Sequence, residues 1–262
     1  MVFSYGLKLW SINDNYIPDA VRLFRNGACQ YIELFIVPDS YDRWIDQWKR
    51  FLDEEGVHFI IHAAHFRGGM NLAKKENEAK NMVLIKEAQQ FAGHLNADKI
   101  IVHPGIVGEI SETARQLKKI NDKRILVENK PYRALDDGLL CNGSTPEEIS
   151  FVMREAGVGF CMDIGHAICA ANGHGVEPEA FLSKFVSLVP CIYHISDGDK
   201  NSVYDSHKHI GEGNFDLRLL LSMIPPGSMI TIETEKDTKD NLNDYRNDVS
   251  LLRGIHAKQK QK

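Results

Sequence analysis

The sequence predicts an α/β fold, a single (β/α)8 barrel of the TIM type, on three observations. The 262 residues are close to the roughly 250 that one such barrel needs. Eight short apolar segments alternate with longer amphipathic ones along the whole chain. No linker or low-complexity segment interrupts this alternation. We therefore expect one barrel domain over residues 1–256, followed by a charged C-terminal tail at 257–262.

The eight apolar segments have the length and the side chains of buried parallel strands, which helices cover on both faces. Eight strand–helix units favour a closed barrel over an open doubly wound sheet. The open alternative is weaker because no G-x-G-x-x-G motif or phosphate loop follows a strand. The predicted strands are Phe3–Trp10, Tyr31–Val37, Val57–His62, Lys99–His103, Ile125–Glu128, Gly159–Asp163, Cys191–Ile195 and Met229–Glu233.

Amphipathic stretches between these strands predict helices. The segment Ser144-Thr145-Pro146-Glu147-Glu148 is typical of a helix start, since it places a capping hydroxyl before proline and acids in the first turn. The predicted helices are Tyr41–Glu55, Lys74–Leu95, Ser111–Ile120, Thr145–Ala156, Pro178–Leu188, Phe215–Ile224 and Asn241–His256.

Composition and charge limit the function classes. The net charge of −5 argues against broad, non-specific affinity for nucleic acid, although bound metal ions could still create a local positive site. No apolar run is long enough to span a bilayer and no signal pattern begins the chain, so we expect no membrane partner. The five cysteines lack C-x-x-C spacing and fit buried thiols in a reducing cytoplasm.

Polar residues of metal-ligand type gather at one end of the predicted strands. In an α/β barrel the active site lies at the carboxyl ends of the strands, and this is where the residues occur. A last group follows the seventh strand, in the loop before Gly211-Glu212-Gly213. The candidates are His62, His65, His103, Glu128, Asp163, His166, His194, Asp205, His207 and Glu233.

Each candidate also has a structural alternative. A single histidine at a strand end is more often a hydrogen-bonded loop residue than a ligand, and Asp163 with His166 could be a helix N-cap followed by an exposed histidine. Glu128 and Glu233 resist such an explanation, because an unpaired carboxylate in an apolar strand costs several kcal/mol unless a cation or a proton accompanies it. The pattern over six strands therefore favours one shared site.

The ligand types predict the metal. Imidazole and carboxylate without thiolate suit Zn²⁺, Mn²⁺ or Fe, whereas Mg²⁺ and Ca²⁺ prefer oxygen ligands alone. A catalytic zinc takes about three protein ligands, so this number of candidates could serve roughly two or three ions with bridging carboxylates. In such a cluster the ions activate a water and neutralise the charge of a phosphate in line with it.

Several of these stretches resemble the xylose isomerase-like superfamily, and in particular the endonuclease IV branch, AP endonuclease family 2. They extend over about residues 57 to 235. The matching stretches are Ile101-Val102-His103-Pro104-Gly105, Leu126-Val127-Glu128-Asn129, Cys161-Met162-Asp163-Ile164-Gly165-His166-Ala167, His194-Ile195-Ser196-Asp197, Asp205-Ser206-His207, Gly211-Glu212-Gly213-Asn214 and Ile232-Glu233-Thr234.

The resemblance implies a cluster of three zinc ions in a phosphodiesterase that acts on DNA at abasic sites, as in DNA repair. One further histidine ligand is implied after the third strand. His62 ends that strand, whereas His65 has the better spacing to Asn71-Leu72, and both remain candidates. The implied ligands in this chain are His103, Glu128, Asp163, His166, His194, Asp205, His207 and Glu233.

Two enzymatic interpretations follow from the resemblance. In a phosphodiesterase, Glu128 and Glu233 would bridge the metals or orient the attacking hydroxide. In a sugar or sugar-phosphate isomerase or epimerase, Glu128, Asp163, His194 and Glu233 would hold a single Mn²⁺-type ion, and the two glutamates would exchange a proton beside a carbonyl. A barrel that binds a ligand without chemistry is a third interpretation, and the paired glutamates count against it.

The large number of ligands favours the phosphodiesterase. Two features favour the isomerase: the first strand, Gly6–Ser11, differs from the endonuclease IV opening, and the loop Arg67-Gly68-Gly69-Met70 lacks a bulky wedge for DNA. The cations Lys130, Arg67 and Arg133 could bind a phosphate or could be solvated loop charges. We predict the phosphodiesterase, with the isomerase or epimerase as the alternative.

Overall fold

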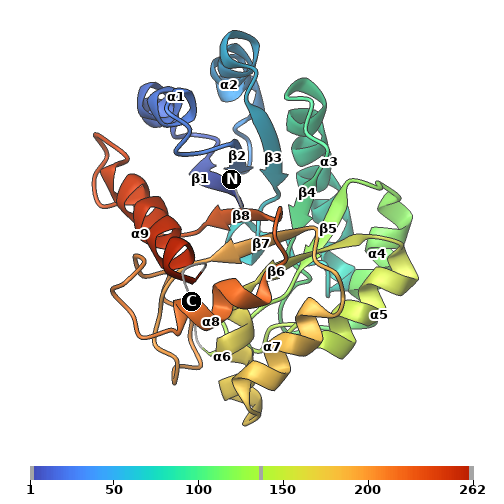
Figure 1. Cartoon of the computed structure of the whole chain (residues 1–262). Coiled ribbons are helices and arrows are strands. Elements are labelled where there is room, and N and C mark those ends of the chain that lie inside the picture. The colour runs from blue at the N-terminus through green and yellow to red at the C-terminus, as the bar shows by residue number, and fades with distance from the viewer. Residues whose placement is uncertain (1–2, 136–137, 260–262) are drawn as a thin grey trace.

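The strands form the predicted closed barrel. The computed structural model describes residues 3–135 and 138–259. All neighbouring strands are parallel and follow chain order, and the first strand pairs with the last (Figure 1). The strands are β1 (Ser4–Trp10), β2 (Tyr31–Phe35), β3 (His58–His62), β4 (Ile100–Val102), β5 (Ile125–Glu128), β6 (Gly159–Asp163), β7 (Ile192–Ile195) and β8 (Met229–Ile232). Each lies within a predicted segment.

Helices surround the barrel, as Figure 1 shows. They are α1 (Ile17–Arg25), α2 (Tyr41–Glu55), α3 (Glu78–His94), α4 (Ile110–Ile120), α5 (Pro146–Ala156), α6 (Ile164–His174), α7 (Pro178–Val186), α8 (Leu217–Met223) and α9 (Asn243–Gln259), with 3-10 turns η1 (Asp14–Tyr16), η2 (Phe66–Gly68) and η3 (Lys75–Asn77). The capping box predicted before α5 is present, since Thr145 and Glu148 cap each other's backbone amides.

Three features differ from the sequence prediction. Helices α1 and α6 are not among the amphipathic stretches named from the sequence, although Asp163 and His166 suggested a helix N-cap where α6 begins. Helix α6 is buried at eight consecutive positions from Ile164 to Ala171, so it lacks the polar face by which an amphipathic helix is detected. Helix α9 continues to Gln259, so the first three residues of the predicted tail are helical, and 260–262 lie outside the described residues.

Inside the barrel, a layer of apolar side chains is followed, two residues further along the strands, by polar side chains. Its apolar layer consists of Tyr31, Ile60, Ile101, Leu126, Cys161 and Ile192, with Met229 packed against them. Side chains two positions apart on a strand point to the same face. The residues two positions further on are Glu33, His62, His103, Glu128, Asp163, His194 and Thr231. The alternation of the strands therefore aims seven polar side chains at the carboxyl end of the barrel interior.

Two expectations about the environment can be compared with the structure. Within the described ranges, no helix combines the length and apolar character needed to cross a membrane. All five cysteines are free thiols, and only Cys191 is exposed.

Candidate metal centre

The predicted ligands converge on one cavity of about 470 Å³ at the carboxyl ends of the strands. Its lining includes His62, His103, Glu128, His166, Asp205 and His207. Beneath it, buried, lie Asp163 and His194. The strand ends bring these residues together from positions as far apart in sequence as His62 and Glu233.

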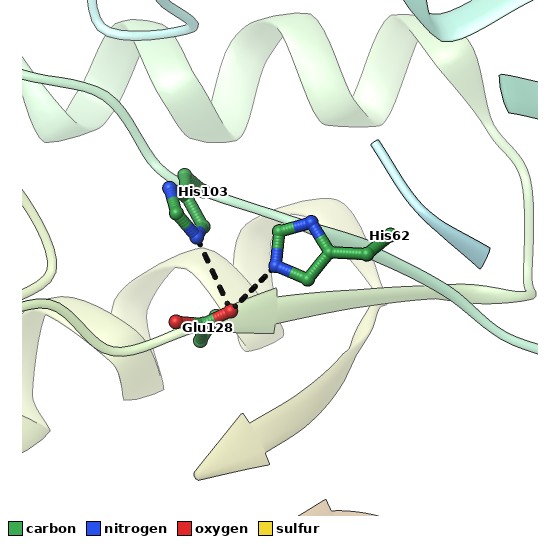
Figure 2. Close-up of side chains that lie close together, drawn as sticks. All are labelled: His62, His103 and Glu128. Atoms are coloured by element: carbon green, nitrogen blue, oxygen red, sulfur yellow. Dashed lines mark hydrogen bonds and ion pairs between the residues drawn. The ribbon is translucent and has the colours of Figure 1, made fainter. Parts of the chain in front are cut away.

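Glu128 is the centre of the first group of ligand atoms. Figure 2 shows His62 and His103 directed at the same carboxylate oxygen. His62 Nε2 lies 3.0 Å and His103 Nε2 lies 3.3 Å from Glu128 Oε2. Ligand atoms of the three residues all lie within 4.8 Å of one another, close enough to hold one ion. These side chains are placed by β3, by the loop after β4 and by the end of β5.

His62 and His65, the two histidines between which the sequence leaves the choice open, present different ring nitrogens. His62 Nδ1 lies 2.9 Å from the carbonyl oxygen of Ala63 and donates its proton there, which directs Nε2 at Glu128, where a metal ion would take the place of the Nε2 proton. His65 Nδ1 instead accepts from the Arg67 amide at 3.1 Å, so in a neutral ring Nε2 carries the proton. Burial, with Lys130 nearby, lowers the pKa of His65 to about 3. His62 is therefore the better candidate ligand.

His166, Asp205 and His207 form a second group. Asp205 Oδ2 lies 2.8 Å from His207 Nε2 and 3.4 Å from His166 Nε2. Each histidine again donates Nδ1–H to a backbone carbonyl at 2.9 Å, His166 to Asn129 and His207 to Glu233. Both Nε2 atoms therefore face Asp205. His207 has φ 42°, a strained conformation of the kind found at functional sites.

Asp163 and His166 have a structural role together with their place in the site. Asp163 is the N-cap of α6, and its Oδ1 accepts from the His166 amide at 2.6 Å. The N-cap alternative is thus correct, but the exposed histidine that it implied is not, because His166 is buried. Its ring Nδ1 lies 3.1 Å from Glu128 Oε1, so Glu128 connects the two groups.

His194 joins the remaining carboxylates. Its Nδ1 lies 2.7 Å from Glu233 Oε1 and 3.8 Å from Glu128 Oε2. Its Nε2 lies 2.9 Å from Glu33 Oε2. A carboxylate behind a histidine fixes the tautomer and turns the other ring nitrogen toward a metal.

Two residues of the site, Lys8 and Glu33, are absent from the sequence prediction. Glu33 is fully buried and accepts from Thr231 Oγ1 at 2.7 Å. Lys8 lines the cavity and pairs with both Glu33 and Glu233. Both stand inside apolar strands and not at the strand ends, where the predicted ligands lie. The alternation of inward-facing positions could have found them, since Glu33 follows Tyr31 by two positions.

Negative charge dominates the site, with five buried carboxylates against the ammonium groups of Lys8 and Lys130. Burial and the neighbouring Asp205 raise the pKa of Asp163. Burial lowers the pKa of His166, but Asp163 and other acids reverse this and raise it to about 10. Buried carboxylates need paired cations, so the site requires several protons or metal ions. The carboxylates are Glu33, Glu128, Asp163, Asp205 and Glu233.

The donor set fits a metal cluster. Among the described residues, His194 Nδ1 and Asp205 Oδ2 are buried without a hydrogen bond. The Nε2 atoms of His62, His166 and His207 are turned away from the backbone carbonyls that their Nδ1 atoms contact, toward the candidate ligands. Imidazole nitrogens with carboxylate oxygens are ligands that Zn²⁺ and Mn²⁺ accept.

The structure also shows where three other residues named in the sequence analysis lie. Asp197 is buried and accepts from the amides of Gly198, Gly211 and Phe215, so it shapes the loop after β7. Met70 is buried, and the loop after β3 therefore offers no large apolar side chain at this position. Arg133 lines the cavity, and its guanidinium also donates to Gly138 O at 2.9 Å.

Comparison with known proteins identifies the family of this site. A family model described as xylose isomerase-like TIM barrel matches residues 21–255. The chain is 28% identical over 185 residues to an uncharacterised protein of Methanocaldococcus jannaschii, covering 63% of this chain but only 59% of that protein. It is 24% identical over 196 residues to a probable endonuclease 4 of Mycobacterium leprae, covering 70% of this chain and 75% of the relative.

Solved structures of two functional classes share the fold. A D-tagatose 3-epimerase-like protein superposes with a TM-score of 0.75 at 21% identity, over 99% of both chains. Endonuclease IV of Thermus thermophilus superposes with a TM-score of 0.71 at 19% identity, over 97% of this chain and 99% of that one. The resemblance drawn from the sequence motifs is confirmed, while the structural likeness at these identities concerns the fold alone.

Proposed function

The chain belongs to the xylose isomerase-like TIM-barrel family, and on this premise we propose that it hydrolyses a phosphoester with a cluster of about two or three zinc ions. The two functional classes among its relatives are both enzymes by name. A cytoplasmic location is part of the proposal, in keeping with the five free thiols.

The number of ligand groups carries the proposal. A single ion needs three or four protein ligands. The chain offers His62, His103 and Glu128 as one group and His166, Asp205 and His207 as another, and neither group shares a residue with the other. Under a one-metal mechanism the second group would have no metal to bind. The clustering of its ligand atoms therefore supports more than one ion.

Three glutamates of the chain would have different roles around the cluster. Zinc ions, when bound, supply an activated water and stabilise negative charge on phosphate oxygens. Glu128, with one oxygen near His62 and the other near His166, would help to hold the ions of both groups. Glu233 lies between His194 and His207 and would orient the attacking water. Glu33 would hold His194 from behind.

The substrate within this proposal is a phosphodiester, and an abasic site in duplex DNA is the first to test. The relatives named probable endonuclease 4 support this choice. The loop after β3, with glycines at positions 68 and 69, replaces the wedge that the endonuclease IV resemblance implies. The chain would then need other groups to hold an opened DNA strand.

The second candidate is a sugar or sugar-phosphate isomerase or epimerase with one Mn²⁺-type ion. A specific observation favours it: His194 Nδ1 lies near both Glu128 and Glu233, so these three residues with Asp163 can form a compact one-metal site. The two glutamates would then exchange a proton with the substrate. The chain's fold similarity to a D-tagatose 3-epimerase-like protein agrees with this candidate without selecting it.

Metal content distinguishes the two candidates. We would measure metals per chain by elemental analysis of the wild type and of His207→Ala, both purified without chelator or added metal. The hydrolase proposal expects about three zinc ions in the wild type and about one fewer in the variant. About one ion in both proteins, particularly manganese, would favour the isomerase. An abasic duplex and a panel of ketoses with their phosphates would then be assayed for turnover.

A further inference from the structure

The side chain of Lys130 lies among the candidate ligands. Its Nζ is 3.4 Å from His103 Nε2, 3.2 Å from His166 Nε2 and 3.5 Å from Glu128 Oε1. The ammonium thus lies at the junction of the two ligand groups. It approaches Glu128 from the oxygen opposite to the one that His62 and His103 share in Figure 2.

The ammonium and a metal ion compete for these atoms. A neutral imidazole nitrogen has one lone pair, which can accept from the ammonium or bind a metal, but not both. His103 Nε2 is the atom concerned. A divalent ion a few ångströms from an ammonium is also strongly repelled in a buried site. Metal binding at His103 therefore requires the Lys130 side chain to move.

Only the side chain of Lys130 is free to move, because the backbone around it is fixed. Its amide donates to the Gly143 carbonyl at 3.0 Å. The neighbouring Asn129 exchanges two hydrogen bonds of 2.8 Å with the backbone of Asp163. Lysine has four flexible carbons, and Lys130 already lines the cavity. The open direction for its ammonium is into the cavity, over the ligand atoms.

We propose that Lys130 binds an anion once the site has taken up metal. Its ammonium would then be displaced from the ligand atoms into the cavity, where it would bind a phosphate group of the substrate. This inference rests on the proposed reaction with phosphoesters. It gives a reason for a lysine at the centre of a metal site, because the same cation neutralises the carboxylates before loading and faces the substrate afterwards. It also predicts two effects of opposite sign from one substitution.

The first effect is on metal affinity. Lys130→Met keeps the length of the side chain and removes the competing charge. Zinc affinity, measured by competition with a chromophoric chelator, should rise about tenfold. Lys130→Arg, which keeps the charge, should stay within about threefold of the wild type. Lys49→Met removes a lysine that pairs with Asp53 on the surface of α2 and serves as the matched control.

The second effect is on anion affinity. Inorganic phosphate is the probe, titrated calorimetrically into zinc-loaded protein. Its affinity should fall about tenfold in Lys130→Met and remain near the wild-type value in Lys130→Arg and Lys49→Met. Thermal unfolding of each variant checks the fold, and Lys130→Gln replaces Lys130→Met if the latter does not fold.

The outcomes are distinct. Unchanged zinc affinity in Lys130→Met would show that the ammonium does not compete with the metal. Tighter zinc binding with unchanged phosphate affinity would show that the displaced ammonium does not bind the anion. A wild type that binds no phosphate also overturns the inference. Failure of the proposed function would give a different result. The zinc-loaded wild type would bind phosphate through Lys130 but would hydrolyse neither an abasic duplex nor bis(4-nitrophenyl) phosphate.

Discussion

Lys8 Nζ and Glu33 Oε1 lie 3.3 Å apart inside the barrel, at positions that are directly paired between β1 and β2. Glu33 also contacts His194 Nε2 at 2.9 Å, so one buried carboxylate holds both a lysine and a candidate ligand. Neither Lys8 nor Glu33 follows the end of a strand. Lys8 and Glu33 thus support the candidate ligands from within the barrel strands.

Removing the charge of Glu33 should weaken metal binding without removing a proposed ligand. In Glu33→Gln the side-chain volume is kept, but His194 loses its anionic partner. We expect zinc affinity to fall by about 10- to 100-fold, the usual effect of such partners. Chelator competition measures it, and Glu179→Gln on the exposed surface of α7 is the control. Equal zinc affinity in Glu33→Gln and the wild type would show that Glu33 does not position His194.

The two histidines after the apolar part of β3 should behave differently when replaced. His62→Ala removes an Nε2 atom directed at Glu128, so the metal content should fall by about one ion per chain. His65→Ala removes a ring whose Nδ1 only caps the 3-10 turn after it, so the metal content should not change. Elemental analysis compares the two variants. Loss of metal in His65→Ala alone would select the histidine favoured by sequence spacing.

Glu233→Gln should abolish turnover in either enzymatic interpretation. The substitution removes a carboxylate that faces His194 and Lys8, and we expect the rate to fall by at least about 100-fold. The fold should survive, because Lys8 keeps Glu33 as its partner. Circular dichroism and thermal unfolding provide the check on structure. Full activity in this variant would contradict both the hydrolase and the isomerase.

A pH-dependent contribution to stability is expected far from the metal centre, at Asp122 between α4 and β5. The pKa of Asp122 is lowered to about 2, mainly by hydrogen bonding from the Arg124 side chain. Gln89 Nε2 also donates a hydrogen bond of 2.9 Å to the Asp122 carboxylate. A folded-state pKa below the unfolded one stabilises the fold above the unfolded value and loses this effect as the pH falls through the folded value. Asp122→Asn should therefore be less stable than the wild type at pH 7.

The stability difference at Asp122 should shrink between about pH 4 and pH 2. Urea unfolding of both proteins in the presence of chelator measures it and removes the effect of metal loss. A difference that stays constant with pH would mean that the carboxylate charge of Asp122 does not contribute.

The sequence predicts the barrel well because burial of parallel strands leaves a strong local pattern. Ile125–Glu128 and Gly159–Asp163 have the predicted ends. Helix α6 escapes prediction for the opposite reason, since it is buried all round and has no period to detect. The spacing of apolar residues thus predicts helices that have one exposed face and buried runs that are as long as a strand. It does not predict a short helix that is covered on every side.

The site is predicted in part. Strand-end position is enough to find Glu128 and His194, because the carboxyl ends of all strands meet at one face. It cannot choose between His62 and His65, since that choice depends on which ring nitrogen each backbone carbonyl or amide engages. It also misses Lys8, whose significance appears only when Glu33 and Glu233 are seen beside it.

Closure of the barrel between β1 and β8 has a consequence for how the protein matures. Lys8 and Glu233, 225 positions apart, meet only when the last strand has paired with the first. Without β8 and the residue that follows it, His194 would lack one of its anionic neighbours, Glu233. In the proposed metal centre, the full set of ligands would therefore come together only after β8 has closed the barrel.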